Sequence, residues 1–181
     1  MKDIESHSNL IVYHGTNTLI QTIDVTKGKP FKDFGRGFYV TQEYSHARNL
    51  AIRNKYYEKR RFGKECDAYV YTYSLDMDRA RSFKIKEFSV ADLEWIRFVL
   101  DNRRSNKKSH NYDIVTGPTA NDDTALVLKS YFGGVYGDVD SERAMTIALE
   151  LIEAENLPFQ ICFGSNDSTV CLVQKGSARK V

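Results

Sequence analysis

Hydrophobic and polar residues follow two kinds of pattern along this chain. Short runs rich in β-branched and aromatic residues predict strands, and longer stretches with apolar residues three and four positions apart predict helices. Strands are expected at 9–14, 38–40, 68–75, 82–86, 112–116, 159–163 and 168–174. Helices are expected at about 42–60, 90–101, 122–132 and 141–156. Because these elements do not follow a regular strand–helix–strand order, the pattern predicts an α+β fold.

Local features place the ends of these elements and their buried faces. Thr41 is a suitable cap for the first helix, and the polar segment 102–110 is expected to be a loop. Trp95 and Phe98 fall outside the apolar stripe of the second helix. The tail from Lys175 is expected to fray.

The composition is that of an ordinary globular protein. The 181 residues include a hydrophobic share of 41% and a charged share of 28%, with a net charge of +2. No repeat, low-complexity tract or linker divides the chain, so we expect a single domain over 1–181. The net charge is too small to indicate a nucleic-acid-binding protein by itself.

Cysteine usage and apolar run length bear on the compartment. Cys66, Cys162 and Cys171 are odd in number and widely spaced, which favours reduced thiols over a disulfide framework. The polar N-terminus shows no signal-peptide core, and no apolar run approaches the length of a membrane span. We therefore expect a cytoplasmic protein with no membrane partner. The four His and three Cys show no metal-ligand spacing, so no metal is predicted.

Candidate chemistry begins at the end of the first strand, in Tyr13-His14-Gly15-Thr16. Gly15 lets the backbone come close to a ligand because it has no Cβ. His14 places a titratable ring beside that bare backbone. A hydrogen-bonded core histidine is the alternative interpretation of His14.

Two further stretches carry candidate residues. Residues 35–41 read Gly-Arg-Gly-Phe-Tyr-Val-Thr and run directly into the first helix. Residues 159–163 read Phe-Gln-Ile-Cys-Phe, a late strand that opens with a polar side chain. Taken alone, the two glycines are also typical of a turn, and Tyr39 is typical of a strand core.

These three motifs, in this order, resemble the His-Tyr-Glu branch of the ADP-ribosyltransferase superfamily, which includes diphtheria toxin and the poly-ADP-ribose polymerases. The pieces 33–39, 112–122 and 159–163 also resemble a bacterial family of unknown function with this fold. The resemblance covers most of the chain, and its sharpest parts are the first two motifs. It implies a split, mostly antiparallel β-sheet core with flanking helices and an NAD cleft between its halves.

The resemblance also implies roles for individual residues. His14 would hydrogen-bond an adenosine ribose hydroxyl, Gly15 would offer its backbone to the nicotinamide carboxamide, and Tyr39 would stack on the nicotinamide ring. His14, Tyr39 and Gln160 are the candidate catalytic residues. The candidate NAD-binding residues are Tyr13, His14, Gly15, Thr16, Arg36, Gly37, Tyr39 and Leu50.

Two positions depart from the family pattern. Leu50 occupies the place of a second stacking Tyr, which Tyr44 or a Tyr from elsewhere would have to replace. Gln160 occupies the place of a Glu, so hydrogen bonding is kept while the negative charge is lost. Three options remain open: the acceptor brings an anion, another acid reaches the site, or NAD is bound without rapid turnover. The candidate acids are Asp113, Asp122 and Asp123.

Basic residues gather at 53–64, interleaved with aromatic residues, and at 103–108. Solvated helix ends, the pyrophosphate of NAD and nucleic acid are each compatible with this pattern. The sequence and the resemblance together predict mono-ADP-ribosyl transfer from NAD to an unknown protein or nucleic-acid acceptor. A toxin paired with a small antitoxin protein is compatible with the resemblance. The alternatives are a non-catalytic NAD-binding module and a nucleic-acid-modifying or nucleic-acid-binding protein.

Overall fold

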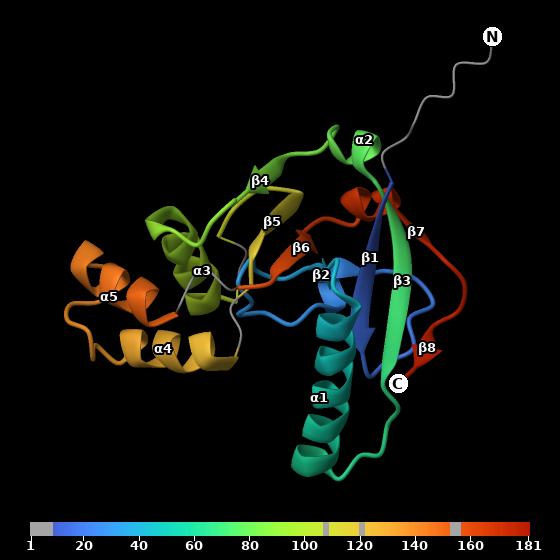
Figure 1. The fold of residues 1–181 in the computed structure, drawn as a ribbon, viewed down its shortest axis with the longest axis horizontal. Coiled ribbons are helices and arrows are strands. Elements are labelled where there is room, and N and C mark those ends of the chain that lie inside the picture. The colour runs from blue at the N-terminus through green and yellow to red at the C-terminus, as the bar shows by residue number, and fades with distance from the viewer. Residues whose placement is uncertain (1–8, 107–108, 120–121, 153–156) are drawn as a thin grey trace.

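The computed structural model describes residues 9–106, 109–119, 122–152 and 157–181. Helices and strands both occur, so the expected α+β class is confirmed (Figure 1). The strands are β1 (Asn9–Thr16), β2 (Phe38–Val40), β3 (Tyr69–Asp76), β4 (Ile85–Glu87), β5 (Ile114–Pro118), β6 (Phe159–Phe163), β7 (Leu172–Gln174) and β8 (Arg179–Lys180). The helices are α1 (Tyr44–Phe62), α2 (Met77–Ala80), α3 (Leu93–Arg104), α4 (Asp122–Phe132) and α5 (Glu142–Ile152).

The strands form two sheets that meet at one point. The first sheet has the order β1-β3-β7, with β8 also on β3, and all its pairs are antiparallel. The second sheet has the order β2-β6-β5-β4, and only its β4–β5 pair is parallel. Tyr13 in β1 and Thr41, just after β2, exchange backbone hydrogen bonds of 2.7 and 2.9 Å. The split, mostly antiparallel core is therefore as expected.

The second sheet is buried on both faces. Alternate side chains along its strands point to opposite faces, and each face packs in a different core cluster. Phe38 and Phe163 pack with Tyr73 of the first sheet in one core cluster. Val115 and Cys162 point to the opposite face of this sheet. They belong to the other core cluster, which residues of α3, α4 and α5 complete. Figure 1 shows these three helices together on one side and the first sheet on the other. No helix of the described residues is long and apolar enough to cross a membrane.

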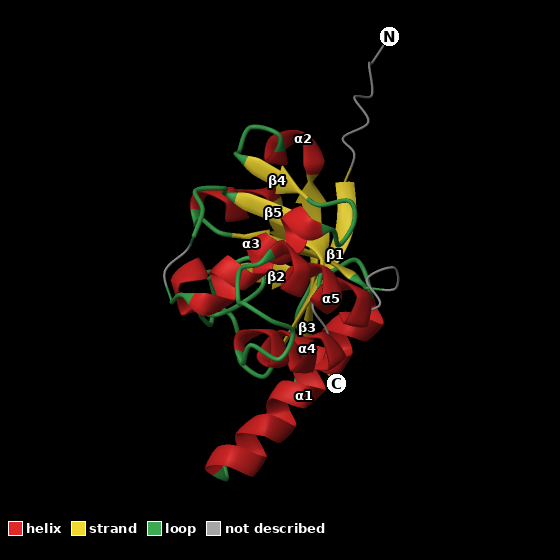
Figure 2. Cartoon of the chain, turned by 90° about the vertical axis from the view of Figure 1, so that its left-hand side faces the viewer, coloured by secondary structure: helices red, strands yellow, loops and turns green. Residues whose placement is uncertain are grey.

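Helix α1 lies against β1 and β3 with Ala47 and Ala51 buried. A Cβ added to Gly15 would lie 1.8 Å from the carbonyl oxygen of Ala47, so only glycine allows this approach. The nearest neighbour that explains this glycine is therefore the helix backbone. The C-terminal part of α1 projects beyond the two sheets (Figures 1 and 2).

The C-terminal segments differ from the prediction. Residues Asp167–Cys171 form a 3-10 helix, and the strand there is limited to β7. The hydroxyl of Ser168 donates to the carbonyl oxygens of Asp113 and Ser165, and such local bonds compete with sheet pairing. The tail is not frayed, because β8 pairs with β3 and Lys180 forms an ion pair of 2.8 Å with Asp67.

Helix boundaries also differ from the prediction. Helix α1 begins at Tyr44 after Glu43, and the Thr41 hydroxyl instead accepts from the Glu43 N–H. Helix α3 extends into the expected loop and ends at Arg104. Trp95 of α3 is fully buried and donates its indole N–H to the carbonyl of Pro118 at 3.0 Å. The predicted stripe was too narrow because this helix packs against both a sheet and α5. Residues 153–156 of the last predicted helix lie outside the described residues.

Candidate functional site

A cleft of about 970 Å³ lies at the end of β1, beside β2 and the first half of α1. The segment 17–32, between the first two strands, forms much of its wall. The cleft is at the upper end of the size range of small-molecule sites. Of the predicted residues, His14, Gly15, Thr16, Gly37, Tyr39, Leu50 and Gln160 line it. Three motifs that are far apart in sequence therefore share one cleft.

His14 is held in a defined orientation. Its Nδ1 lies 2.7 Å from the carbonyl oxygen of Tyr39, and its ring stacks on Phe38 with centroids 4.2 Å apart. Since a carbonyl only accepts, Nδ1 carries the proton, and Nε2 of the neutral ring is an acceptor. Burial lowers the pKa of His14 to about 4, so the ring is neutral near pH 7.

This pKa makes stability depend on pH. Unfolded His14 binds a proton below its ordinary pKa of 6.5, whereas the folded ring resists protonation down to about 4. The unfolded state therefore holds more protons in this window, and the free energy of unfolding falls as the pH is lowered through it. We expect His14 to account for about 2–3 kcal/mol of loss between about pH 7 and about pH 4.5. Urea unfolding of the wild type and His14→Gln at both pH values measures this difference, and equal pH dependence in the two proteins would contradict it.

The register of β1 directs the backbone N–H and C=O of Gly15 toward the cleft. Tyr13 directs its N–H and C=O toward Thr41 and away from β3. In an antiparallel ladder this direction repeats every second residue, so the N–H and C=O of Gly15 also point away from β3. Gly15 lines the cleft, so the register of β1 directs these two groups to the cleft side of the strand.

The Tyr39 ring is fixed by its hydroxyl group. The hydroxyl donates to the Gly35 carbonyl at 2.6 Å and accepts from the Phe34 N–H at 3.1 Å. Gly35 has φ of 79°, a backbone conformation that favours glycine. Burial raises the pKa of Tyr39 well above its usual range, so the hydroxyl stays protonated. The Tyr39 ring is therefore a rigid wall of the cleft.

Asp33 is the functional candidate that sequence reasoning missed. It is 5% exposed and lines the cleft. Its Oδ2 accepts from the Gln160 side-chain amide at 3.0 Å, and its Oδ1 lies 2.6–2.7 Å from the Arg103 guanidinium. The hydroxyl of Thr119 lies 3.5 Å from the same carboxylate. A carboxylate is therefore present next to Gln160, although it comes from a different element.

Of the acids proposed from the sequence, Asp113 does not supply this charge. Asp113 accepts from the backbone N–H of Lys84 and is not part of the cleft wall in the described residues. The side chains of Asp122 and Asp123 lie outside what the structure describes. Only the identity of Asp33, within the motif before Gly35, was available as a signal.

Three other predicted positions have local partners. Tyr44 lies edge-on to Tyr13 with centroids 5.4 Å apart, and among the described residues neither lines the cleft. Arg36 donates to the carbonyl oxygens of Thr26 and Gly28 at 3.0 and 2.7 Å, which holds the loop that forms the cleft wall. Tyr44 thus does not replace the stacking Tyr that is absent at position 50, and Leu50 itself lines the cleft.

The two basic stretches differ in their surroundings. Arg103 is bound to Asp33 at the cleft, and Arg104 pairs with Asp140 at 2.6 Å, so the second stretch is used in structural ion pairs. Lys107 and Lys108 lie outside the described residues. Substituting the basic residues of 103–108 by neutral ones would therefore disturb the cleft through Arg103. Such a variant cannot test nucleic-acid binding separately from NAD binding. Cations from two segments also line the cleft: Lys27, Lys29, Lys32 and Arg53.

The fold and the cleft define an α+β protein with a cleft at the junction of two sheets, and several cationic side chains line that cleft. Residues 10–173 match the sequence profile of a family described as Protein of unknown function (DUF3990). The chain therefore belongs to the DUF3990 family. No curated protein matches the chain. The three cysteines are free, and the described residues contain no group of three or more His, Cys, Asp or Glu that could hold a metal ion.

Proposed function

We propose that this protein is an NAD-dependent mono-ADP-ribosyltransferase. The observation that carries the proposal is the convergence of His14, Tyr39 and Gln160 on one cleft, with the carboxylate of Asp33 beside Gln160. These residues come from β1, β2, β6 and the loop before β2. The order of motifs that resembles ADP-ribosyltransferases thus coincides with a cleft of suitable size and charge.

The geometry supports a specific binding mode for NAD. Nε2 of neutral His14 accepts from a ribose hydroxyl, because Nδ1 is already committed to the Tyr39 carbonyl. The outward N–H and C=O of Gly15 match the acceptor and donor of a carboxamide. The fixed ring of Tyr39 offers a stacking face to nicotinamide, worth about 0.5–1.5 kcal/mol beyond area burial.

The cations of the cleft suit the diphosphate of NAD. Lys27, Lys29 and Arg53 all line the cleft; the two lysines come from the segment after β1, and Arg53 comes from α1. Charge-assisted hydrogen bonds to phosphate oxygens are about twice as strong as neutral ones. These cations would therefore hold the diphosphate of NAD, while His14 holds the adenosine ribose and Gly15 holds the nicotinamide carboxamide.

The reaction needs charge stabilisation at the ribose. The bond between the ribose anomeric carbon and the nicotinamide nitrogen breaks, and nicotinamide leaves with the bonding pair. The ribose develops positive charge until the acceptor nucleophile bonds to the same carbon and releases its proton, if it has one, to the medium. Asp33, with Gln160 as its hydrogen-bond partner, supplies the negative charge that offsets this positive charge.

A non-catalytic NAD-binding protein is a second candidate. The Asp33 carboxylate is already paired with Arg103, which reduces the charge that it offers to a ribose. Such a protein would bind NAD through the same residues without releasing nicotinamide.

The first test is nicotinamide release from NAD by the purified protein. The second is transfer of label from adenylate-labelled NAD to acceptors in a cell lysate. His14→Ala and Tyr39→Ala are expected to reduce release by at least about tenfold, because the first removes the acceptor for a ribose hydroxyl and the second removes the ring that stacks on nicotinamide. Leu126→Ala, at a position 68% exposed on α4, is the matched control and should be unchanged. Full activity in both cleft variants would sink the site assignment. Saturable NAD binding without release would favour the binding protein.

A further inference from the structure

The face of α1 that lines the cleft continues beyond it. His46, Asn49, Leu50 and Arg53 lie on the cleft wall at spacings of three and four residues. With about 100° per residue, the positions that continue this face toward the end of the helix are Tyr57, Arg60 and Arg61. We call these three residues the α1 stripe.

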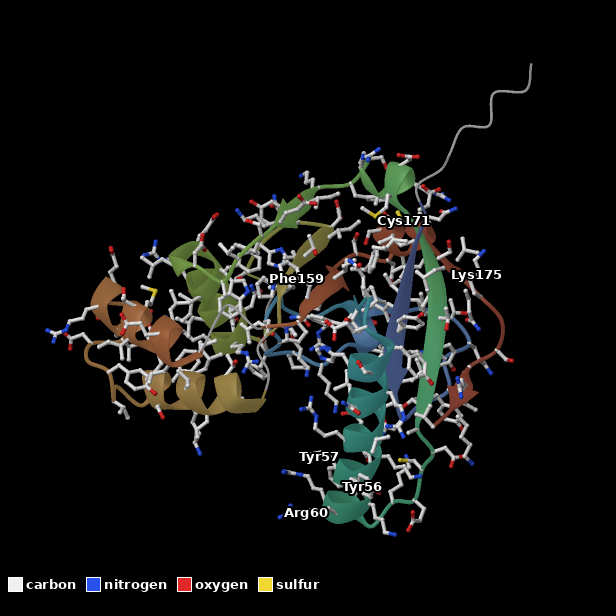
Figure 3. The ribbon with its side chains drawn as sticks, viewed as in Figure 1. Tyr56, Tyr57, Arg60, Phe159, Cys171 and Lys175 are labelled. Atoms are coloured by element: carbon white, nitrogen blue, oxygen red, sulfur yellow. The ribbon has the colours of Figure 1, made fainter. Side chains whose placement is uncertain are left out.

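The α1 stripe is accessible and positively charged. Tyr57 is 46% exposed, and Arg60 and Arg61 are exposed. Helix α1 carries six Lys and Arg residues against one Glu. Figure 3 shows Tyr57 and Arg60 at the end of α1 that projects away from the two sheets. No sheet or helix of the described residues is seen to cover this end of α1 (Figures 1 and 2).

A contact connects the α1 stripe with the cleft. The Lys29 ammonium lies 5.8 Å from the centroid of the Tyr57 ring, and Lys29 also lines the cleft. Arg61 lies over the same ring at 5.8 Å. Together with Arg53 on the cleft wall, these groups place basic and aromatic side chains along α1 from the cleft toward the end of the helix.

This combination of groups fits one class of polymer. Arginines along a path attract a phosphate backbone, and an exposed aromatic ring between them offers a stacking face to an unpaired base. An acidic peptide would use the arginines but not the Tyr57 ring, and a duplex keeps its bases stacked inside. We propose that the α1 stripe is a docking surface for single-stranded nucleic acid, which it leads to the cleft. That such a strand is the ADP-ribose acceptor follows only if the proposed function holds.

Binding of fluorescent single-stranded RNA and DNA of about 20 nucleotides, measured by anisotropy without NAD, tests the docking surface. The double variant Arg60→Gln, Arg61→Gln is expected to bind at least about tenfold more weakly and to lower the slope of log affinity against log salt by about 1.4. Tyr57→Ala is expected to weaken binding about fivefold or more through lost stacking. A duplex of the same length and an acidic peptide should bind less tightly than the single strand.

The chain offers a matched control on the opposite face of α1. The double variant Lys55→Gln, Lys59→Gln removes the same charge, and Lys59 is already paired with Glu65 at 2.8 Å. This control should bind nearly as well as the wild type, and equal weakening in both double variants would overturn the proposal. Tighter binding of duplex or acidic peptide would also overturn it.

Nicotinamide release without oligonucleotide separates this inference from the proposed function. Release should be the same in the wild type and in the α1 stripe variants. Stripe-dependent binding without any release would leave the docking surface intact and refute the transferase. Nicotinamide release without stripe-dependent binding would refute the docking surface and leave the proposed transferase intact.

Discussion

Asp33→Asn is expected to slow nicotinamide release from NAD by about 10²–10³-fold, which corresponds to about 3–4 kcal/mol of transition-state stabilisation. The side chain keeps its size and its place beside Gln160 and Arg103, but it loses the charge that offsets the developing positive charge on the ribose. NAD affinity, measured by calorimetry, should change much less, because the ground-state ribose is uncharged.

A swap of the two side chains separates charge from structure. In the double variant Asp33→Asn, Gln160→Glu, the amide and the carboxylate exchange places across a hydrogen bond of 3.0 Å. We expect this variant to recover a substantial part of the lost rate, because the negative charge stays in the cleft. Thr119→Val is the control for the weak 3.5 Å contact to Asp33 and should remain within about threefold of the wild type. Unchanged release in a folded Asp33→Asn protein would remove Asp33 from the mechanism.

Gly15→Ala is expected to destabilise the protein by at least about 3 kcal/mol, a large part of the stability of a typical domain. The added Cβ would lie 1.8 Å from the Ala47 carbonyl oxygen and 2.6 Å from its carbonyl carbon. Because both atoms are backbone, the conflict cannot be relieved by a side-chain rotation, and α1 must move away from β1. Thermal and urea unfolding of the purified variant measure the loss.

Gly133→Ala is the matched control for this substitution. Its added Cβ would approach no atom closer than 3.4 Å, the Ser130 carbonyl oxygen. We expect a change within about 1 kcal/mol, as for most substitutions without a steric conflict. If Gly15→Ala unfolded at the same denaturant concentration as Gly133→Ala, the close packing of α1 on β1 would be disproved.

Local periodicity was sufficient to predict most of the elements. The run of β-prone residues around Tyr39 and the helical spacing around Ala47 depend only on residues within a few positions, and both elements are observed. The 3-10 helix Asp167–Cys171 was missed because hydrogen bonds of Ser168 and Thr169 replace sheet pairing there. Trp95 was misassigned because a periodic stripe records one buried face, whereas α3 is covered on more than one side.

The candidate site divides in the same way. The sequence by itself determined the residue types of the cleft, since His14, Gly15, Tyr39 and Gln160 lie in motifs that can be read without a structure. Tertiary structure alone decided which acid lies among them. Asp33 meets Gln160 across 127 positions and Arg103 across 70, and no local pattern encodes such pairs.

Tertiary structure also decided why Gly15 is a glycine and what the basic residues do. The close neighbour of Gly15 is Ala47, more than thirty positions later in the chain, because β1 and α1 pack in contact. Arg103 and Arg104 pair with acids, whereas Arg60 and Arg61 remain at the exposed end of α1. The sequence shows an arginine in both settings. Only packing determines whether its charge is paired with a neighbouring acid or exposed to a partner.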